Sequence, residues 1–126
     1  MTVWSVLIVD DSTAIRKVIS ELFRREGDFE VCGEAENGQD AIEKAQRLKP
    51  ALIVTDLSMP VMNGLEETRI LKKLMPKVPV ILYSAYVDKI VEKEALAAGA
   101  SAAVPKFDAV SLLVARSRQV LSERAA

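Results

Sequence analysis

The sequence contains no histidine and only one cysteine, Cys32. Without histidine, the chain has no imidazole for catalysis, for metal binding or for carrying a phosphoryl group as phosphohistidine. A single cysteine excludes an intramolecular disulfide and a thiolate metal centre, and we interpret Cys32 as a small strand residue. No apolar run approaches the length of a membrane span, and the first residues lack the basic and apolar segments of a secretion signal. We therefore expect no membrane contact and a cytoplasmic location.

Neither sign of charge is in excess. Lysine and arginine number 17, aspartate and glutamate number 18, and the formal net charge is −1. A protein that binds a nucleic acid backbone needs a basic surplus, so this balance argues against direct nucleic acid binding. Half of the 126 residues are hydrophobic and 28% are charged, which is typical of a globular protein. A chain of this length buries about two-thirds of its unfolded surface, and we predict a single domain over residues 1–126.

Two apolar runs that end in carboxylates dominate the sequence. Residues 6–9 are followed by Asp10 and Asp11, and residues 52–55 are followed by Asp56. Such runs are typical of strands that are buried on both faces of a parallel sheet. In open α/β sheets, ligands bind beyond the carboxyl ends of the strands. We therefore expect three carboxylates to lie at one edge of the sheet.

Helical and extended patterns alternate along the whole chain, which predicts a doubly wound α/β fold with a five-stranded parallel sheet. The predicted strands are residues 6–9, 29–35, 52–56, 78–83 and 102–105. The predicted helices are residues 12–26, 38–49, 65–75, 87–98 and 110–121. Strand 29–35 is more polar than the others and strand 102–105 contains a proline, so both are expected at sheet edges.

Helix ends and inward-facing positions follow from the same patterns. Glycines at positions 27 and 99 are expected to end the first and fourth helices in the left-handed conformation. Helical spacing predicts core-facing apolar side chains, which include Val18, Leu74 and Ile90. Two aromatic residues near the carboxyl ends of the last strands, Tyr83 and Phe107, are also expected in the core.

The predicted strand ends carry a set of groups suited to phosphoryl chemistry. Three close carboxylates repel one another, so either some are protonated or a cation such as Mg²⁺ lies among them. Ser84 and Lys106 follow two further strands. A carboxylate nucleophile, a metal ion, a hydroxyl and an ammonium together form a site for a phosphoryl group, and an ionised carboxylate needs no general base. Each of these residues alone is equally well explained as a turn residue, a helix cap or a solvated side chain. Their shared position at the carboxyl ends of strands favours a phosphoryl site.

The candidate residues occur together with further motifs, namely Asp10-Asp11, Asp56 with Met59-Pro60 and Asn63-Gly64, Ser84, and Gly99-Ala100 ahead of Lys106. At these positions the chain resembles the response-regulator receiver domain of the CheY-like family. The resemblance covers essentially the whole chain in order and spacing, and it implies the strand order 2-1-3-4-5 that this family has.

The resemblance implies a phosphoacceptor and a metal site. Asp56 would accept a phosphoryl group from a sensor histidine kinase or a phosphotransfer protein and form an acyl phosphate. Asp11 and Asp56 would bind Mg²⁺, with Asp10 taking part directly or through water and the backbone carbonyl of Ser58 completing the protein ligands. The implied activity is that of a switch which catalyses only its own phosphorylation and dephosphorylation.

The resemblance also implies how the switch is read out. Lys106 would pair with a phosphate oxygen, and Ser84 would move to bond the phosphoryl group, which biases the face formed by the fourth helix, the fifth strand and the last helix. Ala103 stands where many members carry an aromatic residue, so we expect coupling through Tyr86 or through backbone shifts. Pro105 precedes the lysine instead of following it, and we expect no cis peptide after Lys106.

Alternative functions remain open beside the switch. A Mg²⁺-dependent phosphatase with an aspartyl nucleophile resembles this site, but the haloacid-dehalogenase type requires a second Asp at position 58, which is Ser, and a cap domain. A flavin-binding site would need a phosphate-binding loop after the first strand, and Asp10-Asp11 stands there instead. A degenerate receiver that takes no phosphate conflicts with the presence of all five site residues. The expected output is either a C-terminal domain absent from this chain or a docked effector protein, with a phosphorylation-linked homodimer as a further option.

Overall fold

The computed structural model describes residues 3–106 and 110–125, in which five strands and five helices alternate. The strands are β1 Trp4–Val9, β2 Phe29–Ala35, β3 Leu52–Asp56, β4 Val80–Ser84 and β5 Ala102–Pro105. The helices are α1 Thr13–Arg24, α2 Gly38–Leu48, α3 Gly64–Leu74, α4 Lys89–Ala98 and α5 Val110–Ala125. All strand pairs are parallel, and the sheet order is β2-β1-β3-β4-β5. The predicted doubly wound α/β fold is confirmed.

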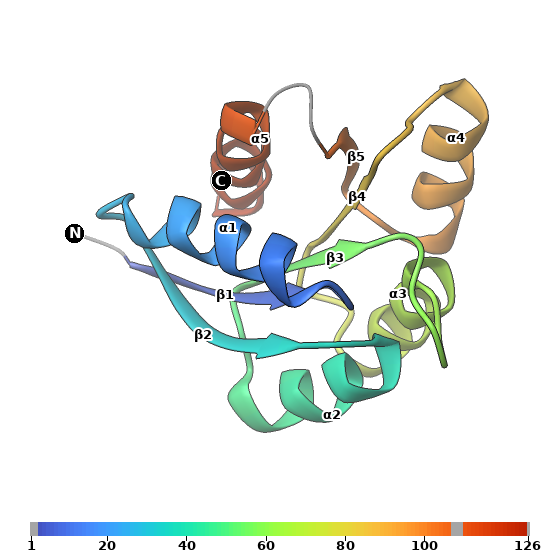
Figure 1. Cartoon of the computed structure of the whole chain (residues 1–126), viewed down its shortest axis with the longest axis horizontal. Helices are drawn as coiled ribbons and strands as arrows, with labels where there is room; N and C mark the ends of the chain where they lie inside the picture. Colours follow the sequence, from blue (N-terminus) through green and yellow to red (C-terminus); the bar gives the residue numbers. More distant parts are fainter. Residues whose placement is uncertain (1–2, 107–109, 126) are drawn as a thin grey trace.

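Helices cover both faces of the sheet, with α1 and α5 on one side and α2, α3 and α4 on the other (Figure 1). Alternate residues of β1 explain this arrangement, because Val6 and Ile8 pack into the α1–α5 side whereas Leu7 and Val9 pack into the α2–α3 side. A strand buried on both faces requires an uninterrupted apolar run. The apolar pattern therefore sets the layers, and the first polar residues after each run lie at the edge of the sheet.

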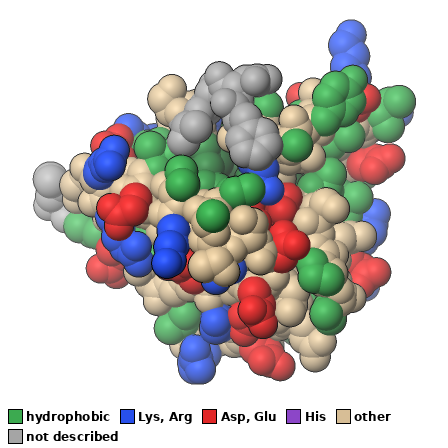
Figure 2. Space-filling view, viewed as in Figure 1, with side chains coloured by type: hydrophobic (Ala, Val, Ile, Leu, Met, Phe, Trp, Pro, Cys, Tyr) green, Lys and Arg blue, Asp and Glu red, His purple; other side chains and the backbone are tan. Residues whose placement is uncertain are grey.

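The two predicted edge strands are confirmed as edges. β2 pairs only with β1 and β5 only with β4 among the strands described. Pro105 is the last residue of β5, opposite Ser84, so its missing N–H interrupts no interior ladder. On the face of the molecule that Figure 2 shows, acidic and basic side chains lie side by side. No helix in the part of the chain that the structure describes is long and apolar enough to cross a membrane.

In the described part of the chain, four helices begin at a side-chain cap. The capping oxygens accept a hydrogen bond from the backbone N–H three residues further on, which satisfies one of the free N–H groups of the first turn. The capping residues are Ser12, Asn37, Asn63 and Asp88. Gly99 ends α4 with φ 107°, as predicted. The prediction for Gly27 was wrong, because α1 already ends at Arg24 and its right-handed C-cap residue, Arg25, needs no glycine.

Three predicted core positions are exposed. The exposed fractions are 60% for Val18, 50% for Leu74 and 69% for Ile90. Each helix contacts the sheet along a stripe narrower than its run of apolar residues, so the residue at the border of the stripe remains in solvent. Tyr83 is buried as predicted, whereas Phe107 lies outside the described residues.

Candidate functional site

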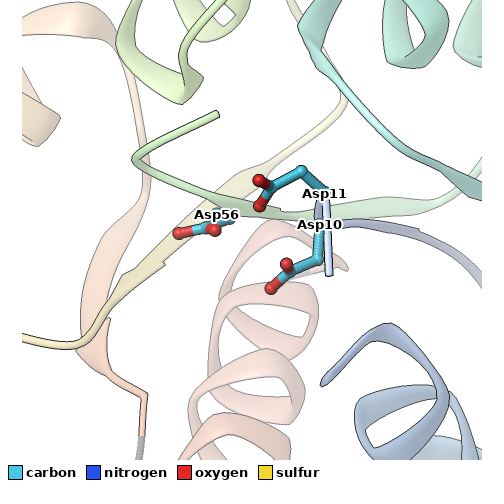
Figure 3. Close-up of side chains that lie close together, drawn as sticks. All are labelled: Asp10, Asp11 and Asp56. Atoms are coloured by element: carbon cyan, nitrogen blue, oxygen red, sulfur yellow. The ribbon is translucent and has the colours of Figure 1, made fainter. Parts of the chain in front are cut away.

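The carboxyl ends of β1 and β3 bring three carboxylates together. β1 and β3 are neighbours, so the residues that follow Val9 lie beside the end of β3. One carboxylate oxygen from each of Asp10, Asp11 and Asp56 lies within 4.8 Å of the others. The side chains converge from the two strand ends (Figure 3). Asp10 and Asp56 are buried and Asp11 is exposed, so the group opens to solvent on the side of Asp11.

Lys106 contributes a cation to this group. Its Nζ lies 3.0 Å from Asp56 Oδ2 and 3.1 Å from Asp10 Oδ2. Burial disfavours the ammonium, but hydrogen bonds to Asp56 and Asp10 outweigh burial and raise the pKa of Lys106. Burial is also the largest influence on Asp56 and raises the pKa of that carboxyl; Lys106 opposes the rise and the charge of Asp10 adds to it. The ammonium is therefore shared between two buried carboxylates.

Two serines flank Asp56. The backbone N–H of Ser58 donates to Asp56 Oδ1 at 3.3 Å, which places the Ser58 backbone beside the acidic group. Ser84 ends β4, the strand next to β3. Its Oγ accepts a hydrogen bond from the backbone N–H of Tyr86 at 3.4 Å, and its carbonyl accepts one from the backbone N–H of Lys106. All six residues singled out from the sequence thus come from adjacent strand ends.

The loop between β3 and α3 approaches the phosphoacceptor candidate closely. A Cβ atom on Gly64 would lie 2.3 Å from the Asp56 carbonyl oxygen, so this position requires glycine. Within the loop, Val61 has φ 68° and the backbone N–H of Met62 donates to the Pro60 carbonyl at 2.7 Å. Together these contacts form a tight turn around a β-branched residue in the left-handed region, which is a strained arrangement.

Tyr83 is a member of the site that the sequence analysis assigned only to the core. Its buried hydroxyl lies 2.9 Å from Asp10 Oδ2 and 2.8 Å from the Val9 carbonyl oxygen. Lys106 Nζ lies 5.2 Å from the centre of its ring, a cation–π distance. Burial and the charge of Asp10 raise the pKa of Tyr83, so the phenol stays protonated and donates to the carboxylate. A tyrosine inside an apolar strand gives no sequence signal for this contact.

Arg16 is a second residue that the sequence analysis did not identify. From α1 it donates to the Asp10 carbonyl at 2.6 Å and to Glu34 Oε1 at 3.0 Å. Ser12 N–H donates to Asp10 Oδ1 at 2.8 Å. The Arg16 bonds fix the chain where β1 turns into α1. The Ser12 bond holds the Asp10 carboxylate through Oδ1, whereas Lys106 lies at Oδ2.

A buried carboxyl on α3, Glu67, lies beneath the site. Its side chain bonds the Thr55 hydroxyl on β3, one residue before Asp56. Burial raises the pKa of Glu67 to about 8, against a smaller lowering by the Thr55 hydrogen bond. The sequence does not predict the burial of Glu67, because Glu66 and Glu67 together are typical of a solvent-exposed first turn of a helix.

Ala103, which departs from the family pattern, packs in a cluster with Leu82, Ala95 of α4 and Ala100. Tyr86, the alternative coupling residue, is exposed. Relay through Tyr86 remains a prediction. No cis peptide occurs among the described residues; the bond after Lys106 leads to a residue outside them.

Comparisons with known proteins agree with the geometry. A family model described as the response regulator receiver domain matches residues 6–118. The chemotaxis protein CheY of Thermotoga maritima is 39% identical over 95 residues, which is 75% of this chain and 78% of that protein. The crystal structure of the response regulator domain of Thermotoga maritima CheB superposes with a TM-score of 0.90 at 32% identity and covers 95% of this chain and 97% of that one.

A longer relative shares the same segment. The protein-glutamate methylesterase/protein-glutamine glutaminase of Nocardioides is 43% identical over 103 residues, which is 80% of this chain. That match covers 28% of the relative, so the chain spans less than a third of its length. The similarity therefore concerns one part of that protein.

Proposed function

Because the chain belongs to the response-regulator receiver domain family, homologous to CheY and to the CheB receiver domain, we propose that it is a switch in which Asp56 accepts a phosphoryl group. The observation that carries this proposal is the position of Asp56, with its Oδ2 3.0 Å from Lys106 Nζ and a carboxylate oxygen within 4.8 Å of those of Asp10 and Asp11. An ionised Asp56 oxygen attacks the phosphorus atom of the donor. The bond from phosphorus to the donor breaks, and its electron pair leaves with the donor.

The acidic group fits a divalent cation of the Mg²⁺ type. Asp10, Asp11 and Asp56 supply carboxylate oxygens within 4.8 Å of one another, and Lys106 neutralises only one of the three charges. Hard oxygen donors in this arrangement suit Mg²⁺, which keeps several waters and takes one or two protein carboxylates. Asp11 and Asp56 would hold the ion, with Asp10 and the Ser58 carbonyl as the remaining candidates. The bound ion supplies charge neutralisation for the phosphoryl oxygens.

Lys106 and Ser84 respond to the phosphoryl group. In the free protein Lys106 bonds Asp56 Oδ2, and after transfer a phosphoryl oxygen replaces that carboxylate oxygen as its partner. Phosphorylation adds about −1.5 to −2 charges in general. Ser84 lies on the neighbouring strand end and donates its hydroxyl to the same group, which moves β4 and the adjoining α4–β5–α5 face between two states.

The partners follow from the chemistry of the switch. The phosphoryl donor is a sensor histidine kinase or a phosphotransfer protein, since the described site contains the acceptor carboxylate and the chain has no histidine. The output is an effector protein or an output domain joined to this one. Methylesterase activity belongs to the longer relatives, and we propose that residues 1–126 form one receiver domain that performs no turnover chemistry beyond its own phosphoryl group. A cytoplasmic location remains a prediction from the sequence.

The test is intact-protein mass after incubation with acetyl phosphate and Mg²⁺. The wild type should gain one phosphoryl group and lose it slowly by hydrolysis, whereas Asp56→Asn should gain none. Asp88→Asn is the matched control, because Asn caps a helix as well as Asp does and Asp88, which caps α4, is not a member of the acidic group. No adduct on the wild type, or an equal adduct on Asp56→Asn, would contradict the proposal.

A further inference from the structure

The carboxyl of Glu67 is fully enclosed, with an exposed fraction of 0%. Its Oε1 lies 2.7 Å from Thr55 Oγ1, and its Oε2 has no hydrogen-bond partner among the residues that the structure describes. An ionised carboxylate with one hydrogen bond and no solvent is strongly disfavoured. The raised pKa, about 8, makes the neutral acid the main form at neutral pH. Glu67 therefore holds a proton beneath the site under ordinary conditions.

Thr55 connects this carboxyl to Asp56. Its hydroxyl oxygen is 2.7 Å from Glu67 Oε1 and 3.3 Å from the Asp56 carbonyl oxygen. A hydroxyl has one hydrogen, so it donates to only one of these acceptors at a time. When Glu67 is protonated, the acid donates to Thr55 and the threonine hydrogen is free for the Asp56 carbonyl. When Glu67 is ionised, the charged oxygen is the stronger acceptor and takes the threonine hydrogen.

The charged side chains on the helices next to α3 are paired with one another or exposed. On α2, Asp40 and Lys44 pair with each other at the end of β2. On the sheet, the charge of Glu67 acts on Tyr83 of β4 and contributes to the raised pKa of that phenol. The remaining charged residues of α2 and α4 are exposed: Glu43, Arg47, Lys89, Glu92, Lys93 and Glu94.

We propose that Glu67 is a positioning residue for the phosphoacceptor, whose neutral carboxyl directs the Thr55 hydroxyl toward the Asp56 carbonyl and thereby couples its own protonation to phosphorylation of Asp56. The inference rests on the proposed function. Ionisation of Glu67 withdraws a hydrogen bond from the Asp56 backbone and adds a negative charge to the same interior. Phosphorylation also adds negative charge there, so the two events oppose each other, and the coupling is reciprocal.

The experiment compares initial rates of phosphorylation by acetyl phosphate and Mg²⁺ for wild type and Glu67→Gln, measured by intact mass from about pH 6.5 to about pH 9.5. The donor and the other site groups titrate equally in both proteins, so the ratio of the two rates isolates Glu67. The ratio of wild type to variant should fall about fivefold, the worth of one ordinary hydrogen bond, with its midpoint near pH 8. Glu66→Gln, an exposed neighbour on the same turn, should follow the wild type at every pH.

Two variants of Thr55 separate the relay from a simple effect of charge. Thr55→Ser retains the hydroxyl and should retain the pH dependence, whereas Thr55→Val, which has a similar shape, should remove it. A flat ratio with both proteins phosphorylated would overturn this inference alone, as would an unchanged pH profile in Thr55→Val. Absence of phosphorylation in every protein at every pH would overturn the proposed function and the inference with it.

Discussion

The buried carboxyl of Glu67 makes a prediction about stability that needs no phosphoryl donor. In the unfolded chain this carboxyl titrates near its ordinary pKa of 4.5, and in the folded protein near 8. The folded state therefore binds the proton more tightly than the unfolded chain does. The contribution of this proton to the unfolding free energy is complete below pH 4.5 and is lost as pH rises toward 8. At ~1.4 kcal/mol for each pH unit between these values, the loss is about 5 kcal/mol. That is comparable with the whole unfolding free energy of a small domain.

The assay is urea unfolding of wild type and Glu67→Gln at a series of pH values from about 5 to about 8.5. Trp4, the single tryptophan, is half-buried against Phe29 and reports unfolding by fluorescence. The amide of glutamine does not titrate, so the difference in unfolding free energy between the two proteins should change by several kcal/mol across this range, in favour of the variant at high pH. Other carboxylates titrate in both proteins and cancel in the difference.

The slope of that difference, and not its offset, carries the prediction, because a buried glutamine amide has its own cost when one of its groups is unpaired. Glu66→Gln should differ from wild type by a nearly constant amount at all pH values. Parallel curves for wild type and Glu67→Gln would refute the argument, since they would mean that Glu67 is already ionised in the folded protein or is open to solvent.

Three further predictions concern the loop and the metal site. Val61→Gly should raise the unfolding free energy by about 1 kcal/mol in urea titrations, because φ 68° suits glycine and strains valine; a loss of stability would contradict the strain. Gly64→Ala should lower the melting temperature, since its Cβ would meet the Asp56 carbonyl oxygen at 2.3 Å, and an unchanged value would show that the loop yields. Mg²⁺ at ten times its Kd should raise the unfolding free energy of the wild type by about 1.4 kcal/mol in calorimetry, and chelation should reverse the effect. Asp11→Asn should lose this response, and an equal response in both proteins would place the ion elsewhere.

The sequence predicts the layers of this fold and the position of the candidate site for one physical reason. Strands buried on both faces must be apolar throughout, so the polar residues that follow them mark the carboxyl edge of the sheet. Asp10, Asp11 and Asp56 satisfy this pattern, and the structure brings their carboxylates together. The strand order came from the resemblance, because apolar runs alone do not tell which strands are neighbours.

Patterns of apolar residues do not predict contacts between the side chains of elements that are distant in the sequence. Tyr83 has the apolar surroundings of a core residue, and only the sheet order, in which β3 alone separates β4 from β1, shows that its hydroxyl reaches Asp10. Glu67 has the sequence context of an exposed first turn, and only the packing of α3 against β3 shows that it is buried. Conversely, Ile90 has helical spacing that suits a core position, but α4 meets the sheet through its small residues instead.

The central claim is that Asp56 carries the phosphoryl group, and chemical localisation of the modification tests it most directly. Borohydride reduces an acyl phosphate to an alcohol, so an aspartyl phosphate becomes homoserine, which peptide mass spectrometry assigns to one position. After incubation with acetyl phosphate and Mg²⁺, the account predicts homoserine at position 56 and an unmodified side chain at positions 10 and 11. Homoserine at position 10 or 11, or at none of the three, would contradict it.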